Sequence, residues 1–373
     1  MAHAYTPGLK VTERIKVRRE RRLPLPGETL AKVGDRVKGE DPVARTALPG
    51  SVTTVNVAGL LGVPAEDIKG MMSRKAGDPI ERGEMLAQSK GLLGLFKTSV
   101  TSPVKGTVES VSDITGQVIL REPPQPVEVF AYIDGEVTEV IPREGVVIET
   151  VASFIQGIFG IGGETRGELL TVAADPGEVL TAGMIKPEHK GKILIGGSLA
   201  EEPALRAAAA GGVRGVVVGG IEDATLKAFL GYDIGVAITG SEKCGLTLVV
   251  TEGFGRMRMA GRTFALLKSL NGRIASINGA TQIRAGVIRP EVIVPSADTT
   301  SEIKSSLAEG GLKIGTPVRI IREPHFGALG KVAALPVALQ EIETESKARV
   351  LEVELDDKTR VIMPRANVEI IES

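Results

Sequence analysis

The chain has 373 residues, enough for two or three globular domains that each bury a core of their own. Hydrophobic residues make up 42% of it and charged residues 24%, which is too apolar for general disorder. Lysine and arginine total 45, and aspartate and glutamate total 46, so the net charge of −1 creates no global attraction to nucleic acid or an anionic membrane. One cysteine excludes an intrachain disulfide framework, and three separated histidines exclude a zinc site built from His and Cys.

Two apolar features bear on targeting and domain organisation. The first 22 residues lack the apolar core of a signal peptide, so we expect a cytoplasmic protein. The most apolar run, 146–163, is interrupted by Glu149, Gln156 and four glycines, which argues against a membrane span. We interpret this run as a buried strand and a glycine-rich crossover that together act as a linker.

A sequence repeat organises the N-terminal part. Residues 34–44 read GDRVKGEDPVA and residues 77–87 read GDPIERGEMLA. A second element, Gly-x-Val-x-x-Val, begins at Gly50, Gly106 and Gly135. Glycine permits tight turns and valine suits half-buried strands, so we expect an all-β domain over 1–145.

These repeats resemble the two halves of a barrel-sandwich hybrid, the fold of biotinyl and lipoyl carrier domains. RRLPLPG followed by KVGDRVKGE is also similar to the N-terminal region of RnfC-type and NqrA-type subunits of ion-translocating oxidoreductases. The stretch between the halves offers Lys90 and Lys97, but neither lies in the Met-Lys or Asp-Lys pair of a modified carrier. Iron–sulfur chemistry is excluded because one cysteine cannot supply a cluster. We expect the fold without a covalent cofactor.

Residues 164–300 change to an alternating pattern. Apolar strands at 192–197, 215–220, 235–240, 246–255 and 273–279 alternate with predicted helices at 199–212, 222–231 and 257–272. Such alternation predicts a three-layer α/β domain with a parallel sheet that is covered on both faces.

Ligands of such domains bind at the carboxyl ends of the strands, where this sequence places glycines such as Gly253 and Gly255. A basic cluster follows, and we expect it to bind an anion: Arg256, Arg258, Arg262, Arg284 and Arg289. Arg258 and Arg262 are expected to share one face of the predicted helix. The alternatives are ordinary βα-turn glycines and a solvated charged surface.

No catalytic constellation is recognisable. The sequence contains no GxSxG, P-loop or HExxH motif, and Cys244 has no identifiable histidine partner. We therefore expect no cofactor and no metal, and the enzyme hypothesis lacks a nucleophile.

The C-terminal part, 311–373, reads GTPVRIIREPHFGALGKV before several further β-type segments. This pattern closely resembles the KOW motif of NusG-type transcription factors and ribosomal proteins, which implies an SH3-like barrel. As a whole the chain resembles a KOW-containing protein. Gly327 and Gly330 are expected in the turn between two strands, with Gly330 at a positive φ.

The resemblance implies that the barrel docks on RNA polymerase, a ribosomal protein or RNA. The expected partner-binding residues surround the turn: Arg319, Arg322, His325, Phe326 and Lys331. Nine basic residues against ten acidic ones in 311–373 favour a protein partner slightly over RNA. A second basic run, LKVTERIKVRRERR at 9–22, is interpreted as a binding surface or a charged edge strand.

Two functional classes follow. The first is a non-enzymatic cytoplasmic adaptor that docks through its KOW domain on the transcription or translation machinery. The second is a phosphate- or small-ligand-binding α/β domain, with or without enzymatic activity, flanked by β adaptors. If the arginines of 252–291 converge on the glycine loops in one pocket, the second class is favoured. If they lie on a flat outer surface, the first class is favoured.

Overall fold

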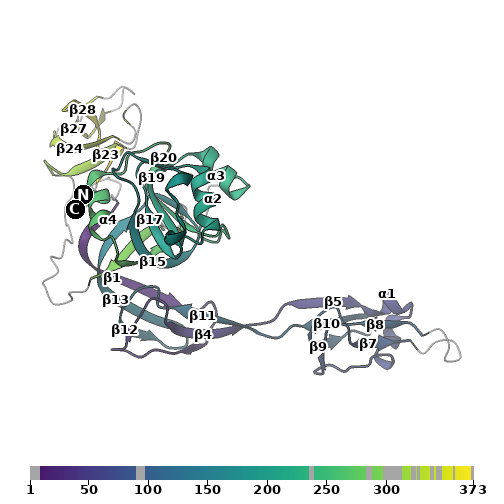
Figure 1. Ribbon diagram of the computed structural model, residues 1–373. Helices are drawn as coiled ribbons and strands as arrows, with labels where there is room; N and C mark the ends of the chain where they lie inside the picture. Colours follow the sequence, from purple (N-terminus) through teal and green to yellow (C-terminus); the bar gives the residue numbers. More distant parts are fainter. Residues whose placement is uncertain are drawn as a thin grey trace.

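A computed structural model describes residues 9–89, 97–234, 239–282, 288–296, 313–320, 325, 328–336, 340–341, 347–355 and 358–370. It shows a mixed α/β protein with three parts: an elongated β-rich arm, an α/β domain and a C-terminal sheet (Figure 1). The largest sheet has 13 strands and continues from the arm into the α/β domain. No helix within the described ranges is long and apolar enough to cross a membrane.

The arm has two lobes, and two extended chain segments join them (Figure 1). The proximal lobe contains β2 (Glu28–Thr29), β3 (Arg36–Val37), β4 (Pro42–Leu48), β11 (Gln125–Phe130), β12 (Gly135–Ile141) and parts of the long paired strands β1 (Val11–Arg22) and β13 (Gly145–Gln156). The distal lobe contains β5 (Val52–Asn56), α1 (Val57–Leu61), the 3₁₀ helix η1 (Ala65–Gly70), β6 (Pro79–Ile80), β7 (Met85–Gln88), β8 (Ser99–Thr101), β9 (Gly106–Val111) and β10 (Gln117–Arg121). Each lobe has its own hydrophobic core.

The sequence repeat corresponds to equivalent local structure in the two lobes. The Gly34 amide donates to the Val137 carbonyl of β12 at 2.8 Å, and the Gly77 amide donates to the Val108 carbonyl of β9 at 2.8 Å. Both glycines are left-handed, with φ of 91° and 94°. One repeat therefore folds with β12 and the other with β9, so the described residues of 9–145 form two lobes where the sequence suggested one domain.

Gly50, the first copy of the valine motif, has a different role. A Cβ atom there would lie 1.8 Å from the Glu122 carbonyl oxygen, because the two connecting segments approach each other closely at this point. The residue at this position therefore determines how tightly the two segments between the lobes can pair.

Residues 146–163 are not a linker. The expected buried strand is present as β13, but it pairs with β1, with β12 and with β22 of the α/β domain. The following strand, β14 (Phe159–Ile161), pairs with β20. This apolar run thus belongs to the shared sheet.

The α/β domain adds the following strands to that sheet: β15 (Glu164–Thr171), β16 (Val179–Leu180), β17 (Lys192–Ile195), β18 (Leu199–Ala200), β19 (Gly215–Ile221), β20 (Thr247–Phe254), β21 (Ile274–Asn278) and β22 (Glu291–Pro295). Its helical segments are η2 (Ala182–Met184), η3 (Pro187–His189), α2 (Glu202–Ala210), α3 (Asp223–Leu230) and α4 (Gly261–Ser269). The expected strand at 235–240 lies mostly outside the described residues.

The sheet of this domain is mixed, although a parallel one was predicted. Strands β15, β17, β19 and β20 are parallel neighbours, whereas β14, β21 and β22 are antiparallel. Helices α2 and α3 pack on one face, and α4 packs on the other. The apolar strands are therefore buried on both sides, as continuous valine and isoleucine runs require.

The C-terminal part is a five-stranded antiparallel sheet in the order β28-β27-β24-β23-β29. Its strands are β23 (Pro317–Ile320), β24 (Leu329–Ala334), β27 (Val350–Leu355), β28 (Arg360–Pro364) and β29 (Val368–Ile370), with a short hairpin of β25 (Gln340–Glu341) and β26 (Lys347–Ala348) and the 3₁₀ helix η4 (Arg365–Asn367).

The sequence suggested that Gly330 lies in a turn at positive φ. In the structure Gly330 instead lies inside β24, and its φ is not positive. A Cβ atom there would lie 2.5 Å from the Glu354 carbonyl oxygen and 2.6 Å from Cγ1 of Val353. Glycine is thus required by the close approach of β27. Gly327 lies outside the described residues.

Candidate functional site

The carboxyl ends of β17 and β19 are covered by the chain itself. A Cβ atom on Gly219 would lie 2.2 Å from the Met257 carbonyl oxygen, and one on Gly220 would lie 2.0 Å from the Gly255 carbonyl oxygen. Gly197 is enclosed in the same way by the backbone of 175–178. These glycines allow backbone segments to pack closely, and they do not form an open cradle for a phosphate.

The predicted glycines Gly253 and Gly255 turn the chain at the end of β20. They have φ values of 149° and 90°, and the Gly255 amide donates to the Ile221 carbonyl at 2.8 Å. Between them Phe254 is 51% exposed, and its ring lies 4.9 Å from that of Phe159. The turn directs the following segment across the strand ends.

Three predicted arginines lie on this segment and on α4. Arg256, Arg258 and Arg262 are exposed, and none forms an ion pair within the described part of the chain. Helix α4 begins at Gly261, so Arg258 precedes the helix and does not share a helical face with Arg262 as predicted. The glycines at the strand ends face backbone, so these arginines do not surround a glycine-lined pocket there.

The other members of the predicted basic cluster are placed differently. Arg289 is half-buried just before β22, and Arg284 lies outside the described residues. The described arginines thus belong to separate segments, and the three exposed ones lie on the segment after β20 and on α4.

Arg319 connects the C-terminal sheet to the α/β domain. Its side chain is 5% exposed, and its Nη2 atom lies 3.3 Å from Oε2 of Glu252, which is 4% exposed. Nη1 also donates to the Glu252 carbonyl, while the Ala260 amide donates to Oε1 of Glu252 at 3.0 Å. This expected partner-binding residue is used inside the chain, where a buried charge needs an ion-pair partner.

The structure describes two of the remaining predicted partner-binding residues. Lys331 is exposed on β24, and His325 is half-buried. Arg322 and Phe326 lie outside the described residues.

The β27–β28 side of the C-terminal sheet lies away from the α/β domain and carries paired charges (Figure 1). Arg360 bridges Glu352 and Glu354 at 3.5 and 3.4 Å, and Lys358 lies 3.1 Å from Glu354. The hydrogen bond from Lys358 lowers the pKa of Glu354. Next to these charges Ile362 is 66% exposed. Opposite charges around an exposed apolar side chain are suited to a protein surface more than to a phosphate backbone.

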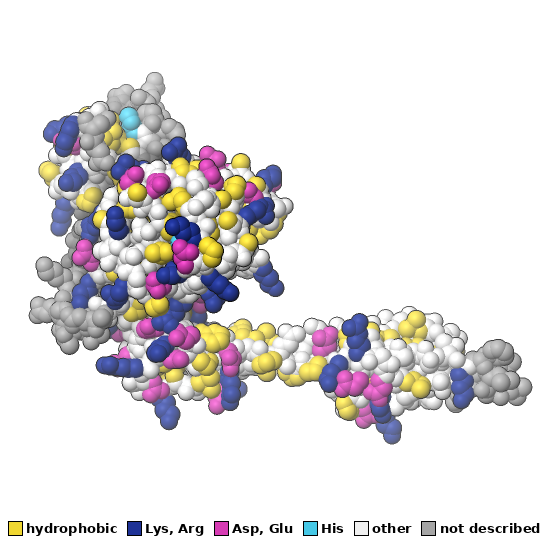
Figure 2. Space-filling model, in the orientation of Figure 1, with side chains coloured by type: hydrophobic (Ala, Val, Ile, Leu, Met, Phe, Trp, Pro, Cys, Tyr) yellow, Lys and Arg dark blue, Asp and Glu magenta, His cyan; other side chains and the backbone are white. Residues whose placement is uncertain are grey.

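The wider surface also shows no uniformly basic face in the view of Figure 2. Dark blue and magenta side chains alternate along the arm and over the α/β domain. This pattern agrees with the balanced composition of the whole chain.

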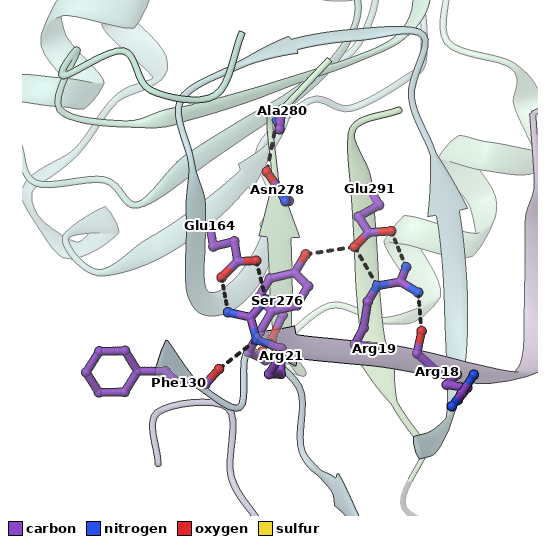
Figure 3. A network of polar contacts seen from close by, with 10 residues as sticks. Arg18, Arg19, Arg21, Phe130, Glu164, Ser276, Asn278, Ala280 and Glu291 are labelled. Carbon is purple, nitrogen blue, oxygen red and sulfur yellow. Dashed lines mark hydrogen bonds and ion pairs between the residues drawn. The ribbon is translucent and has the colours of Figure 1, made fainter. Parts of the chain in front are cut away.

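A polar network fixes the arm to the α/β domain, and it uses the basic run of β1 (Figure 3). Arg19 forms a bidentate ion pair with Glu291 of β22, in which Nε lies 3.0 Å from Oε1. Arg21 donates through two nitrogens to Glu164 of β15, both at 2.7 Å. Bidentate arginine–carboxylate pairs fix the relative orientation of the two side chains as well as the distance between them. The sequence did not single out these pairs, although arginines two apart on a strand share one face.

Tyr132 lies at the centre of this network. It is 5% exposed, its hydroxyl donates to Glu291 at 3.2 Å, and the Arg21 guanidinium lies 5.4 Å from its ring centre. Burial, together with the charge of Glu291, raises the pKa of Tyr132 well above its ordinary value. Tyr132 also has a φ of 70°, which costs energy for a residue other than glycine. We interpret the network as a rigid joint.

The structure provides no activated nucleophile at Cys244. The thiol is partly buried, its Sγ donates to the Leu246 carbonyl at 3.1 Å, and burial raises its pKa. A raised pKa reduces the thiolate fraction that reacts. Among the described residues, no group of three metal-ligating His, Cys, Asp or Glu side chains occurs.

Comparison of the sequence with protein-family models and with curated proteins finds no match. The functional assignment therefore depends on the geometry of the chain itself.

Proposed function

We propose that this protein is a non-enzymatic cytoplasmic adaptor that docks on the transcription or translation machinery through its C-terminal sheet. In this proposal the C-terminal sheet is an SH3-like KOW barrel, and the β-rich arm has the barrel-sandwich hybrid fold without a covalent cofactor. The partner is RNA polymerase or a ribosomal protein, and RNA is the alternative partner of the same domain.

The observation that carries the proposal is the way the C-terminal sheet is mounted. Arg319 of β23 anchors one side of the sheet on Glu252, in a contact that is almost completely buried. The β27–β28 side remains open, with Ile362 exposed among charges of both signs. A domain that is held firmly on one side and exposed on the other suits an adaptor, because docking then positions the rest of the chain.

Two further observations support this class over an anion site at the glycine loops. The glycines at the strand ends pack against backbone, and the three exposed arginines do not surround a glycine-lined pocket. The arm extends away from the α/β domain and is fixed to it by paired arginines and glutamates (Figures 1 and 3). Such a shape separates contact surfaces in space.

The test is capture of the tagged full-length chain from a lysate of its native host, with and without nuclease. We expect RNA polymerase subunits or ribosomal proteins to remain bound after nuclease treatment. Ile362→Glu should abolish their capture, because it places a charge in the exposed apolar position of β28. Deletion of 311–373 is a poorer test, since it would leave Glu252 buried without Arg319.

Ile114→Glu is the matched control, because Ile114 is 88% exposed in the distal lobe. It should leave capture unchanged. Failure of the full-length chain to capture either machinery would refute the proposal, as would equal capture by the Ile362→Glu variant. Loss of capture on nuclease treatment would show that RNA, and not protein, provides the contact.

A further inference from the structure

A groove of about 500 Å³ lies at the carboxyl end of β15, away from the arginines that the sequence emphasised. Its polar lining comes from Thr171, Glu178, Lys268 and Asn271, and its other walls come from 172–174. Small-molecule sites in proteins have volumes of roughly 300–1,000 Å³. The groove is therefore large enough for a small ligand.

The groove lies at the border between the parallel and antiparallel parts of the sheet. Strand β15 lies between its parallel neighbour β17 and its antiparallel neighbour β21. The residues that follow β15 and the last turn of α4 line the groove together. Ligands of α/β sheets commonly bind outside the carboxyl ends of strands.

The hydrogen-bonding capacity of this groove is not fully used. The Thr171 hydroxyl is buried and has no hydrogen-bond partner, although buried polar atoms normally have one. Asn271 accepts a hydrogen bond from the Thr171 amide at 2.7 Å, and its NH₂ group donates to no described residue. The Asn271 NH₂ group can therefore hydrogen-bond a ligand without losing a bond that it already makes, whereas the Thr171 hydroxyl is enclosed and lies beyond the reach of a ligand.

The groove also presents one charge of each sign. The Lys268 ammonium is exposed and forms no ion pair within the described ranges, and it lies 6.0 Å from the centre of the Phe264 ring. Glu178 accepts a hydrogen bond from the Ala174 amide and forms no ion pair with Lys268. A cation and an anion that line one groove without pairing suit a ligand that carries both opposite charges.

We propose that this groove binds a small zwitterion with a carboxylate and an ammonium group, the chemistry of a free amino acid. The carboxylate would interact with Lys268 and with the NH₂ group of Asn271, and the ammonium group with Glu178. The small side chains of Ala173 and Ala174 leave room for the rest of the ligand. This site is separate from the docking surface on β28, and it does not depend on the adaptor proposal.

Saturation-transfer NMR of the full-length chain with an equimolar mixture of free amino acids tests the proposal. At least one amino acid should receive saturation, and its affinity should fall about 10- to 100-fold in Lys268→Met, since a charge-assisted hydrogen bond is lost. Asn271→Asp should weaken binding as well, because it removes the NH₂ donor and keeps an oxygen that accepts from the Thr171 amide. Lys32→Met, which removes an exposed lysine in the arm, is the matched control and should bind normally.

Analogues of the bound amino acid identify the recognised groups. The amide that lacks the carboxylate should not bind, and the hydroxy acid that lacks the ammonium group should bind more weakly. The proposal is overturned if no amino acid receives saturation, if Lys268→Met binds like the wild type, or if inorganic phosphate alone binds. None of these results affects the capture experiment with the Ile362→Glu variant. The adaptor proposal and the amino-acid proposal can therefore fail separately.

Discussion

The buried ion pair between Arg319 and Glu252 predicts that the C-terminal sheet and the α/β domain are energetically coupled. Arg319→Met keeps an apolar stem of similar length but leaves the Glu252 carboxylate buried without its ion-pair partner. Removal of one member of a buried ion pair costs about 3–5 kcal/mol. This cost corresponds to roughly two to four orders of magnitude in the equilibrium for opening the interface.

Hydrogen–deuterium exchange of peptides from β20 and β23 measures that opening directly. Glu252→Gln removes the charge and keeps an oxygen for the Ala260 amide, which lies 3.0 Å from Oε1. The double variant should cost less than the sum of the single variants, because it no longer buries an unpaired charge.

Arg45→Met is the control, since Arg45 and Glu28 form an exposed pair whose members are 57% and 60% exposed. Exposed pairs contribute about 0–1 kcal/mol, so this variant should leave exchange almost unchanged. If Arg319→Met altered exchange in β20 and β23 no more than this control does, the pair would not join the two domains and the reasoning would be refuted.

Four further predictions concern other parts of the chain. The folded protein keeps the Tyr132 proton above pH 10.0 while the unfolded chain loses it, so the free energy of unfolding should fall as pH rises above about 10. Tyr132→Phe should flatten that decline in denaturant titrations, and an unchanged slope would contradict the burial argument. Gly330→Val should destabilise the chain by about 1–3 kcal/mol in chemical unfolding, because the side chain meets the Glu354 carbonyl of β27. Arg258→Ala with Arg262→Ala should flatten the salt dependence of polynucleotide binding by about one unit per lost contact, and unchanged binding at low salt would exclude an anion site there. Intact mass spectrometry of protein from its native host should show no lipoyl or biotinyl adduct.

The regular parts of the fold could be predicted from the sequence because their signals are local. The glycine–aspartate repeats indicated matching turns, and the structure shows equivalent hydrogen bonds at Gly34 and Gly77. Alternating apolar strands and helices indicated an α/β domain, and α2, α3 and α4 all lie within the predicted helical segments. Such patterns arise from side-chain periodicity, which a single sequence displays.

The joints between the parts could not be predicted, because they depend on contacts between distant residues. Arg319 pairs with a glutamate 67 positions earlier, and Arg19 pairs with Glu291, 272 positions later. A basic side chain on a strand does not by itself reveal whether it faces solvent or a buried carboxylate. The groove beside Thr171 was missed for a related reason, since its lining combines the residues after β15 with Lys268 and Asn271, which are distant in the sequence.

The adaptor proposal is tested most directly by photo-crosslinking from position 362 in the native host, with a photoreactive amino acid in place of Ile362. The proposal predicts a crosslink to one defined protein of RNA polymerase or the ribosome, with no such product from the same amino acid at position 114 of the distal lobe. Absence of any crosslink from position 362, or crosslinks to proteins of neither machinery, would contradict it.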